Sequence, residues 1–315
     1  MLKKFDTPIL LLVFNRLEST EKVLKEIRKI KPKRLYVSCD GPRLNNEIDV
    51  NNVTAVRVFI ESFVDWDCEL LTNYYDCNLG CKVAVSSGLD WFFSQVECGI
   101  VLEDDCVPSL SFFNFCEIML NKYENDFRIW HIGGVCNLNS NDFIEDSSYY
   151  FSNYAHIWGW ATWSNRWKFY NRDIKNLHLF KRFKFLKTLT HSIYSRELWT
   201  YSFNSSRLGM VDTWDYQWYY TIWSNGGLTI LPKINLISNI GFGSASTHTK
   251  SSNHFLSNRD RYELNQSEFI EPDFMRVIPK YDKKNEKLLF FHNYYSLLKT
   301  FIYFIFKKIY NDKRN

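Results

Sequence analysis

Three consecutive carboxylates, Glu103, Asp104 and Asp105, are the residues of this sequence best suited to chemistry. They follow residues 100–102, an apolar run without alternation that is typical of a strand buried on both faces, and Pro108 comes soon after them. Adjacent carboxylates repel each other, so they are costly at the end of a buried strand unless a cation or a hydrogen-bond network holds them. Mn²⁺ or Mg²⁺ would remove that cost and would also bind a diphosphate. The alternative is a charged loop after a strand.

A second set of acids, Asp212 and Asp215, stands among aromatic residues in the segment 211–218. A carboxylate enclosed by rings has its proton affinity raised by desolvation, which suits a general base. For Asp212 we favour another role, a helix N-cap, because Asp is a common capping residue. Nine of the eleven tryptophans fall between Trp130 and Trp223. Aromatic rings with polar rims suit the faces of sugars, but the same rings also fill cores, so both roles stay open.

Apolar runs before the acids predict three further strands, at residues 8–14, 35–39 and 69–71. Helical spacing predicts three helices between the strands, at residues 23–30, 53–60 and 83–93, the first with an N-cap at Ser19 or Thr20. An alternating order of strands and helices implies a parallel sheet with helices on both faces.

Polar residues follow several of these predicted strands. Arg16 comes after the first strand, Asp40 after the second, and the three acids after the fourth. Ligands of such sheets bind beyond the carboxyl ends of the strands, so we expect these residues to converge on one crevice. A Gly-x-Gly-x-x-Gly motif and a Walker lysine loop are both missing after the first strand, which disfavours a dinucleotide dehydrogenase and a P-loop enzyme.

The later part of the chain carries further, weaker signals. The aromatic segment 156–163 is followed by a helical region at 181–200 and a strand at 228–237. Small residues in 243–248 allow close backbone approach to a ligand. A lone histidine such as His248 is more often structural, although near an acidic site it could contact a metal or a phosphate.

Composition excludes several classes of protein. The chain of 315 residues suffices for one large domain or two small ones. Its net charge of +4, with mixed charges, is too mild for a nucleic-acid partner. All eight cysteines lie between Cys39 and Cys136 and are expected to be free thiols. Cys77 and Cys81 lack the second pair that a structural zinc site needs.

The two ends of the chain bear on its location. The first residues lack the long apolar stretch of a signal peptide, so we expect a cytoplasmic protein. Residues 288–310 mix apolar side chains with Lys299, Lys307 and Lys308. This pattern fits an amphipathic helix at the inner, anionic face of the cytoplasmic membrane or on a partner, and it also fits a helix packed on its own domain.

Taken in order, the landmarks between residues 8 and 248 resemble those of inverting GT-A glycosyltransferases, specifically N-acetylglucosaminyltransferase I and its bacterial relatives in surface-polysaccharide synthesis. The landmarks are Asn15-Arg16, Ser38-Cys39-Asp40, Asn78-Leu79-Gly80, the acid triplet, Trp158-Gly159-Trp160, Trp214-Asp215 and residues 243–248. The resemblance implies an α/β fold, the Rossmann-like GT-A fold of nucleotide-diphospho-sugar transferases, with a mixed sheet flanked by helices. It divides the chain into a nucleotide-sugar half (1–126), an acceptor and catalytic half of the same domain (127–280), and an amphipathic, basic tail (281–315).

The same resemblance implies roles for single residues. On the donor side, Arg16 and Asp40 would hold the nucleotide, Glu103 and Asp104 would contact uridine, ribose and the sugar, and Ser244 and Thr247 would touch the phosphates. Asp105, with His248, would bind the Mn²⁺ or Mg²⁺ that bridges the diphosphate. On the acceptor side, Trp158, Trp160 and Trp214 would bind the acceptor and Asp215 would be the general base. Relatives carry a second acid where this chain has Tyr216, so Asp212 also stays a candidate for the base.

The implied function is metal-dependent transfer of GlcNAc or a related hexose from a UDP-sugar to a glycan or lipid-linked glycan, with inversion, in lipopolysaccharide or capsule synthesis. A retaining transferase, an inactive carbohydrate-binding protein of the same fold and a sugar-nucleotide pyrophosphorylase are the alternatives. The pyrophosphorylase would need a Gly-rich, basic first loop, which residues 15–18 do not supply.

Overall fold

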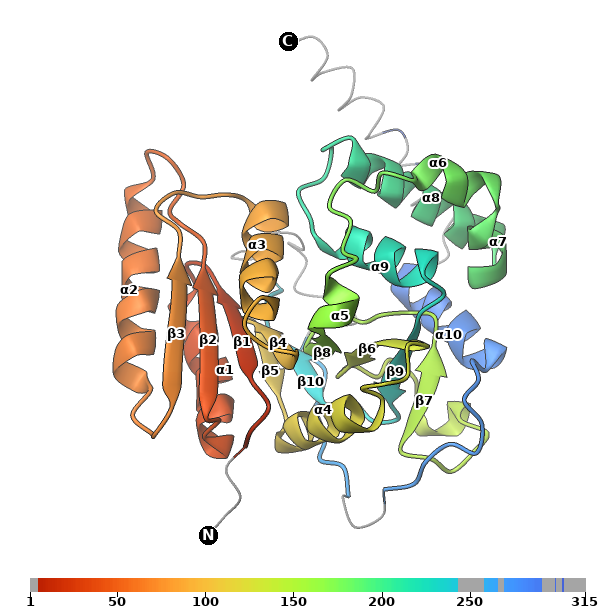
Figure 1. The fold of residues 1–315 in the computed structure, drawn as a ribbon, viewed down its shortest axis with the longest axis horizontal. Coiled ribbons are helices and arrows are strands. Elements are labelled where there is room, and N and C mark those ends of the chain that lie inside the picture. Colours follow the sequence, from red (N-terminus) through yellow and green to blue (C-terminus); the bar gives the residue numbers. More distant parts are fainter. Residues whose placement is uncertain (1–4, 243–257, 266–268, 291–297, 299–301, 303–315) are drawn as a thin grey trace.

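An eight-stranded mixed sheet forms the centre of the protein, whose computed structural model describes residues 5–242, 258–265, 269–290, 298 and 302 (Figure 1). The strand order is β3-β2-β1-β4-β8-β6-β9-β7. The strands are β1 (Ile9–Val13), β2 (Arg34–Cys39), β3 (Glu69–Tyr74), β4 (Cys98–Glu103), β6 (Ile129–Gly133), β7 (Tyr149–Ser152), β8 (Trp160–Trp163) and β9 (Leu228–Pro232). A separate antiparallel pair joins β5 (Cys106–Pro108) to β10 (Ile237–Asn239).

Two strands of the sheet, β8 in the middle and β7 at the edge, run against the other six. Strands β1 to β4 run parallel, and β8 lies antiparallel between β4 and β6. The two halves predicted from the sequence therefore share one sheet, because β8 from the later half pairs directly with β4 from the earlier half. This arrangement confirms the predicted α/β fold with a mixed sheet flanked by helices.

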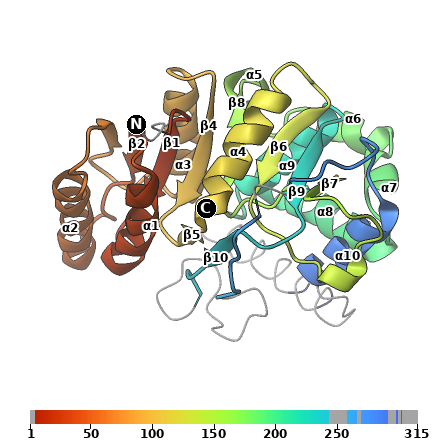
Figure 2. The ribbon, with the colours of Figure 1, turned by 90° about the horizontal axis from the view of Figure 1, so that it is seen from below.

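Two apolar cores lie on opposite faces of the sheet. Strand β1 is buried throughout, and its successive side chains point alternately into one core and the other. One face packs against α1 (Leu17–Ile30), α2 (Glu47–Phe63) and α4 (Leu110–Lys122). The other packs against α3 (Cys81–Phe93) and the aromatic helices of the later half, as Figure 2 shows from below. Burial on both faces explains the unbroken apolar run of β1.

The first helix begins earlier than predicted. Its N-cap is Arg16, so the expectation of Ser19 or Thr20 is wrong. Thr20 is buried inside the first turn, where its hydroxyl donates a hydrogen bond of 2.8 Å to the Arg16 carbonyl. Because the Thr20 hydroxyl donates to a backbone carbonyl four residues earlier, it behaves as a residue inside the helix and not as its N-cap.

The helical region expected at 181–200 is three helices, α6 (Leu177–Arg182), α7 (Phe185–Leu189) and α8 (Ile193–Arg207). Lys184 has a left-handed backbone (φ 57°) between the first two, and Thr190 is extended between the last two. Both conformations stop a helix. Shorter helices in this half are α5 (Ser164–Trp167) and a 3₁₀ turn (Ser140–Asp142), and α9 (Asp215–Ser224) follows α8.

Helix α10 (Pro279–Phe290) covers the start of the segment predicted as a tail. Its acids Asp282 and Glu286 are buried, and they accept hydrogen bonds from the Asn153 backbone (2.9 Å) and the Tyr154 hydroxyl (2.7 Å). Helix α10 is therefore packed into the domain. Most of residues 291–315 lies outside the described residues, and no described helix is both long and apolar enough to cross a bilayer.

Candidate active site

A cavity of about 560 Å³ opens beyond the carboxyl ends of β1, β2 and β4, and its volume is typical of a small-molecule site. The acid triplet and Asp215 both line it. Further lining residues are Phe14, Arg16, Asp40, Arg43, Asn78, Gly80, Trp158, Asp212, Thr213, Trp214, Asn239 and Gly241. The sheet topology thus brings the strand-end residues to one crevice, as expected, and the segment 211–216 closes it from the opposite half of the chain.

Arg16 is the counter-ion of the acid triplet. Its guanidinium forms a bidentate ion pair with buried Asp104, and its Nη2 lies 2.9 Å from Asp105 Oδ2. Burial alone would lower the pKa of Arg16, but the facing Asp104 and Asp105 raise it above its ordinary value. Since strand β1 lies beside β4, the residue after one strand faces the residues after the other. Arg16 thereby neutralises carboxylates instead of standing free for a nucleotide.

One arginine does not balance three acids. Burial, followed by the charges of Asp105 and Asp104, raises the pKa of Glu103 to about 8. Burial likewise raises the pKa of Asp104 to about 6, although Arg16 acts in the opposite direction. The site therefore has more carboxylates than positive charge to hold them ionised, and a bound cation would relieve this excess.

Asp105 is the member of the triplet that we consider as a ligand for such a cation, and it lines the cavity together with Asn239 and Gly241. A Cβ atom at Gly241 would lie only 2.0 Å from Asp105 Oδ2, so the backbone approaches the carboxylate as closely as glycine allows. Asn239 Nδ2 donates to Asp105 Oδ1 at 3.3 Å, and the Ile240 amide donates to the Asp105 carbonyl at 2.9 Å. The described residues hold no cluster of three or more potential metal ligands. Asp105 fits a hard cation that takes its other oxygens from a diphosphate and water.

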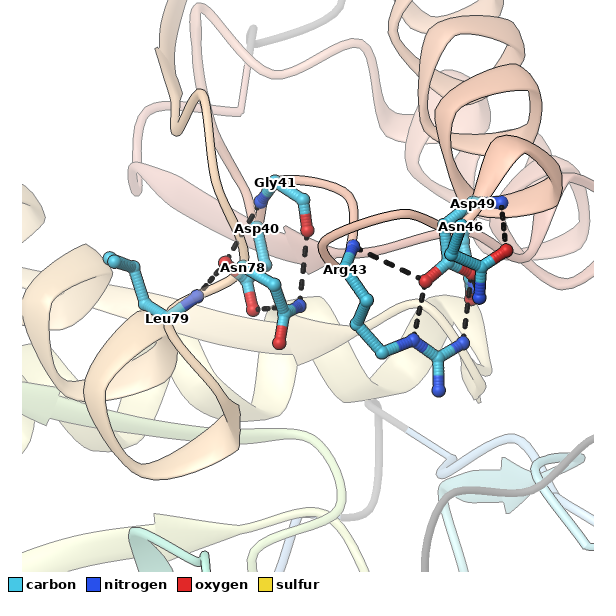
Figure 3. A network of polar contacts seen from close by, with 8 residues as sticks. Asp40, Gly41, Arg43, Asn46, Asp49, Asn78 and Leu79 are labelled. Carbon is cyan, nitrogen blue, oxygen red and sulfur yellow. Dashed lines mark hydrogen bonds and ion pairs between the residues drawn. The ribbon is translucent and has the colours of Figure 1, made fainter.

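Asp40 ties the end of β2 to the loop before α3 (Figure 3). Its carboxylate accepts hydrogen bonds from the amides of Gly41 (2.8 Å) and Leu79 (2.9 Å) and from Asn78 Nδ2 (2.8 Å). Burial raises the pKa of Asp40, and the backbone donors of Leu79 and Gly41 act against that rise. Three donors from the chain leave Asp40 little capacity for a ligand, so its first function is to fix this loop.

Arg43, which the sequence did not single out, forms the rim of the cavity beside this loop. It makes a bidentate ion pair with buried Asp49, which also accepts from Asn15 Nδ2 at 2.7 Å (Figure 3). The Arg43 guanidinium stacks over Phe14, 5.6 Å from the ring centroid. The sequence predicted a helix at 53–60, whereas the partner Asp49 lies in the first turn of α2, before that range.

Asp212 caps a helix far away in the sequence. Its two carboxylate oxygens accept hydrogen bonds of 2.9 Å from the amides of Cys81 and Lys82, the first residues of α3. Gly80, with φ of 79°, lets it come close, because a Cβ there would lie 2.6 Å from Asp212 Oδ2. An acid at a helix N-terminus satisfies free amides and interacts well with the helix dipole. The predicted capping role fits this contact, although the capped helix is α3.

Asp215 is the first residue of α9, a helix that is buried along most of its length. The Tyr216 amide donates to Asp215 Oδ1 at 2.9 Å, and the Thr213 hydroxyl donates to the same oxygen. Both donors come from its own turn, so the carboxylate is fixed at the cavity wall by local contacts. Asp215 and Asp105 line the same cavity, from different halves of the chain.

The three tryptophans expected to bind an acceptor differ in exposure. Trp158 is partly exposed, lines the cavity and meets Phe242 edge-on at 5.6 Å. Trp214 is 2% exposed, although it is among the residues that line the cavity. Trp160 is 0% exposed and stacks between Trp214 (5.6 Å) and His131 (5.2 Å). The expectation for Trp160 is therefore corrected: it packs the core and does not face the cavity.

Three predicted donor-side residues, Ser244, Thr247 and His248, lie outside the described residues. Asn78, Asn239 and Gly241 line the cavity without having been chosen as ligand residues. Asn239 and Gly241 could have been chosen from the sequence, because an asparagine and a glycine closely follow a predicted late strand. All eight cysteines are free, and Cys81 at the cavity is a thiol whose pKa burial raises.

Comparison with known proteins gives partial likenesses. No family model matches the chain, and no curated protein matches its sequence. A mannosyltransferase from Pyrobaculum calidifontis, solved with GDP-mannose and Mn²⁺, is 15% identical over 51% of this chain with a TM-score of 0.36, and the match spans 46% of that enzyme, less than half its length. The 4-diphosphocytidyl-2C-methyl-D-erythritol synthase of Anaerococcus prevotii is 13% identical over 56% of this chain and 84% of its own, with a TM-score of 0.33.

Proposed function

We propose that the protein is a metal-dependent glycosyltransferase that moves a hexose, GlcNAc or a close relative, from a UDP-sugar to a hydroxyl of a glycan or lipid-linked glycan, with inversion. The observation that carries this proposal is that Asp105 and Asp215 line one cavity. The first offers oxygen ligands in an acid-rich corner, and the second stands beside partly exposed aromatic surface. Transfer of a sugar needs both kinds of group within reach of one bound donor.

The acid-rich corner supplies the donor end of the site. Asp105, at the surface of the cavity, would hold Mn²⁺ or Mg²⁺ together with the diphosphate. A bound cation of this kind neutralises charge on a departing nucleotide diphosphate. Asp104 is paired with Arg16 and, with Glu103, lines the cavity where ribose and sugar hydroxyls would donate hydrogen bonds.

The rim formed by Phe14, Arg43 and Asp40 suits the nucleoside. Phe14 and the guanidinium stacked on it offer flat surfaces for a pyrimidine ring. Asp40 fixes the backbone of Asn78 and Leu79 beside that surface. We assign the uridine of the donor to this rim, with Asp40 acting mainly through the loop that it holds.

The opposite wall supplies the acceptor end. Asp215 would take the proton from the attacking hydroxyl, because its carboxylate is held rigidly at the cavity surface by Thr213 and Tyr216. Trp158 offers the exposed ring on which a sugar acceptor would stack. Asp212 is engaged with the amides of α3, so Asp215 is the better candidate for the base.

Thermal-shift measurements on the full chain test the proposal. UDP-hexoses are expected to raise the melting temperature only when Mn²⁺ is present, because the cation completes the diphosphate site. Asp105→Asn should abolish that metal-dependent rise. The matched control is Asp173→Asn, an exposed acid away from the cavity lining, which should keep it.

A product assay separates this function from its alternatives. UDP release that depends on an added glycan acceptor supports transfer, and the anomeric configuration of the product by NMR distinguishes inversion from retention. Pyrophosphate release from UTP and a sugar 1-phosphate would identify a pyrophosphorylase instead. Metal-dependent donor binding without either reaction would identify an inactive carbohydrate-binding protein.

A further inference from the structure

The segment from residue 174 to residue 196 has an unusual charge pattern. It holds six cations and no acid. The six are Lys175, Lys181, Arg182, Lys184, Lys187 and Arg196, and all except Arg196 are exposed. Within the part of the chain that the structure describes, none of the five exposed cations forms an ion pair. The positive charge of this surface is therefore not balanced by any acid among the described residues.

Apolar side chains are exposed among these cations. Phe183 is 63% exposed and Ile193 is 72% exposed, and Leu179 and Phe185 also reach the surface. The rings of Phe183 and Phe185 lie next to each other, with centroids 5.8 Å apart. We refer to these four apolar residues with Lys181, Arg182, Lys184 and Lys187 as the α6–α7 patch. Large exposed apolar side chains in one group are characteristic of an interaction surface.

The inner side of the same segment is firmly anchored. Leu177, Phe180 and Leu186 are buried in the core that contains the aromatic helices, and Phe180 packs on Phe203 and Tyr220. Helices α6 and α7 are thus apolar on the side facing the domain and also present apolar residues outward. A surface helix needs only one apolar face to pack, so the outer apolar side chains are not needed to hold α6 and α7 on the domain.

A second exposed apolar surface shows what is distinctive here. Helix α2 exposes Ile48 and Val58 to a similar degree, 71% and 60%. It carries Glu47 and Glu61, and Arg57 is its one basic residue. Apolar exposure and uncompensated positive charge occur together on the α6–α7 patch, whereas α2 has the apolar exposure without an excess of positive charge.

We propose that the α6–α7 patch docks the protein on an anionic lipid bilayer. Phenylalanine and leucine side chains bury at the level of the headgroups, while surrounding lysines are attracted to anionic lipid. Lysine predominates over arginine in the patch, which suits long-range attraction to a charged surface more than the bidentate pairing of a shaped protein partner. Docking through this patch does not depend on the proposed transfer reaction.

The position of the patch fits docking without disruption of the fold. Figure 1 shows α6, α7 and α8 gathered beyond α9, at the edge of the molecule and away from the central sheet. Helix α8 leads directly into the segment 211–216 that closes the cavity. A bilayer seated on α6 and α7 would therefore lie on the half of the molecule that carries Asp215.

Co-sedimentation of the full chain with vesicles tests the inference. Vesicles of phosphatidylcholine with one quarter phosphatidylglycerol are expected to bind the protein, with weaker binding as salt increases, and pure phosphatidylcholine should bind far less. The double variant Lys184→Glu/Lys187→Glu should weaken binding about tenfold or more, because each basic residue contributes to the attraction. Phe183→Ser/Phe185→Ser should weaken it even at low salt, since the apolar contribution does not depend on salt.

Matched controls separate the patch from other basic surfaces. Lys22→Glu/Lys25→Glu on α1 makes the same change of charge elsewhere and should leave binding within twofold of the unaltered chain. Lys307→Glu/Lys308→Glu tests the basic C-terminal segment. Binding that is lost in this last variant and kept in both patch variants would overturn the proposal.

Two further outcomes would also overturn it. Equal binding to pure phosphatidylcholine would remove the role of charge. Concentration-dependent dimerisation that the patch substitutions abolish, without any vesicle binding, would identify a second copy of the chain as the partner. Because the lysines of the patch are exposed, their variants are expected to melt within a few degrees of the unaltered chain, which keeps the test readable if the phenylalanine variant folds poorly.

Discussion

The cavity has two walls that are held in place by different forces. The acidic wall, made of Arg16, Glu103, Asp104 and Asp105, is fixed by ion pairs at adjoining strand ends. The aromatic wall comprises Trp158, Asp212, Trp214 and Asp215 and is fixed by stacked rings and by hydrogen bonds at helix ends. Charge therefore decides the stability of the first wall, and packing decides that of the second. Substitutions in each wall can separate the two.

The largest effect is expected at the aromatic wall. Asp215→Asn should reduce transfer by about 10²–10⁴-fold, because an amide cannot accept the proton of the acceptor hydroxyl. Donor binding at the acidic wall should persist, and the Mn²⁺-dependent thermal shift measures it. Transfer at the unaltered rate in this variant would move the base away from Asp215.

A charge deletion tests the acidic wall. Arg16→Gln leaves Asp104 buried without its cation and should lower the free energy of unfolding by roughly 2–4 kcal/mol at pH 7.5, measured by urea denaturation without metal. The loss should shrink at pH 5, where Asp104 can take up a proton. The double variant Arg16→Gln/Asp104→Asn is the control, and it should recover most of the loss, since it removes the unpaired charge as well.

Acid should act on the two walls in opposite directions. Burial lowers the pKa of His131, which packs under the aromatic wall against Trp160 and accepts from Trp218 Nε1, to about 3. The unfolded chain binds this proton near pH 6.5, so the stabilisation is present above that pH and is lost as the pH falls toward 3. Going from pH 7 to pH 5 should cost about 2 kcal/mol through His131.

At the acidic wall, the raised pKa of Glu103, about 8, means that its protonation favours the folded chain as the pH falls from 8 toward 4.5. Urea denaturation of metal-free protein across this range measures both effects. His131→Gln should flatten the acid-side slope, whereas His178→Gln, at an exposed site, should not. Equal slopes in the two variants would show that His131 does not carry the acid sensitivity.

The smallest effect concerns the contact between the halves. Asp212→Ala removes the cap of α3 and should cost about 1 kcal/mol of stability, together with a several-fold loss of transfer, because Asp215 lies three residues along. Ser192→Ala is the matched control. It removes the cap of α8, where the Ser195 amide donates to the Ser192 hydroxyl at 3.0 Å, and should lower stability without changing transfer. An equal loss of transfer in the two variants would show that Asp212 affects transfer only through the stability of the fold.

The two walls also differ in how far the sequence foretold them. The strands that carry the acidic wall were found to within one or two residues, because burial on both faces gives an unbroken apolar run. The convergence of Arg16 and the acid triplet followed from the topology. The pairing of Arg16 with Asp104 did not, since neither residue type nor spacing says which carboxylate an arginine will meet.

The aromatic wall was harder to foresee. Trp158 and Trp160 stand two residues apart, yet one is partly exposed and the other is fully buried. Their sequence context is the same, and only the packing of β8 under α9 separates them. The helical region at 181–200 was likewise split by the left-handed residue Lys184, whose conformation no periodicity reveals.

The sequence by itself determined the parallel strands, the side of the sheet on which chemistry is placed, and the acids available there, because these depend on short apolar runs and on the polar residues directly after each run. Tertiary structure alone decided that Asp212 caps a helix beginning at Cys81, and that the segment carrying Asp215 lines the same cavity as Asp105. The physical reason is that a carboxylate binds whichever free amides the fold brings to it, however far away they lie in the chain.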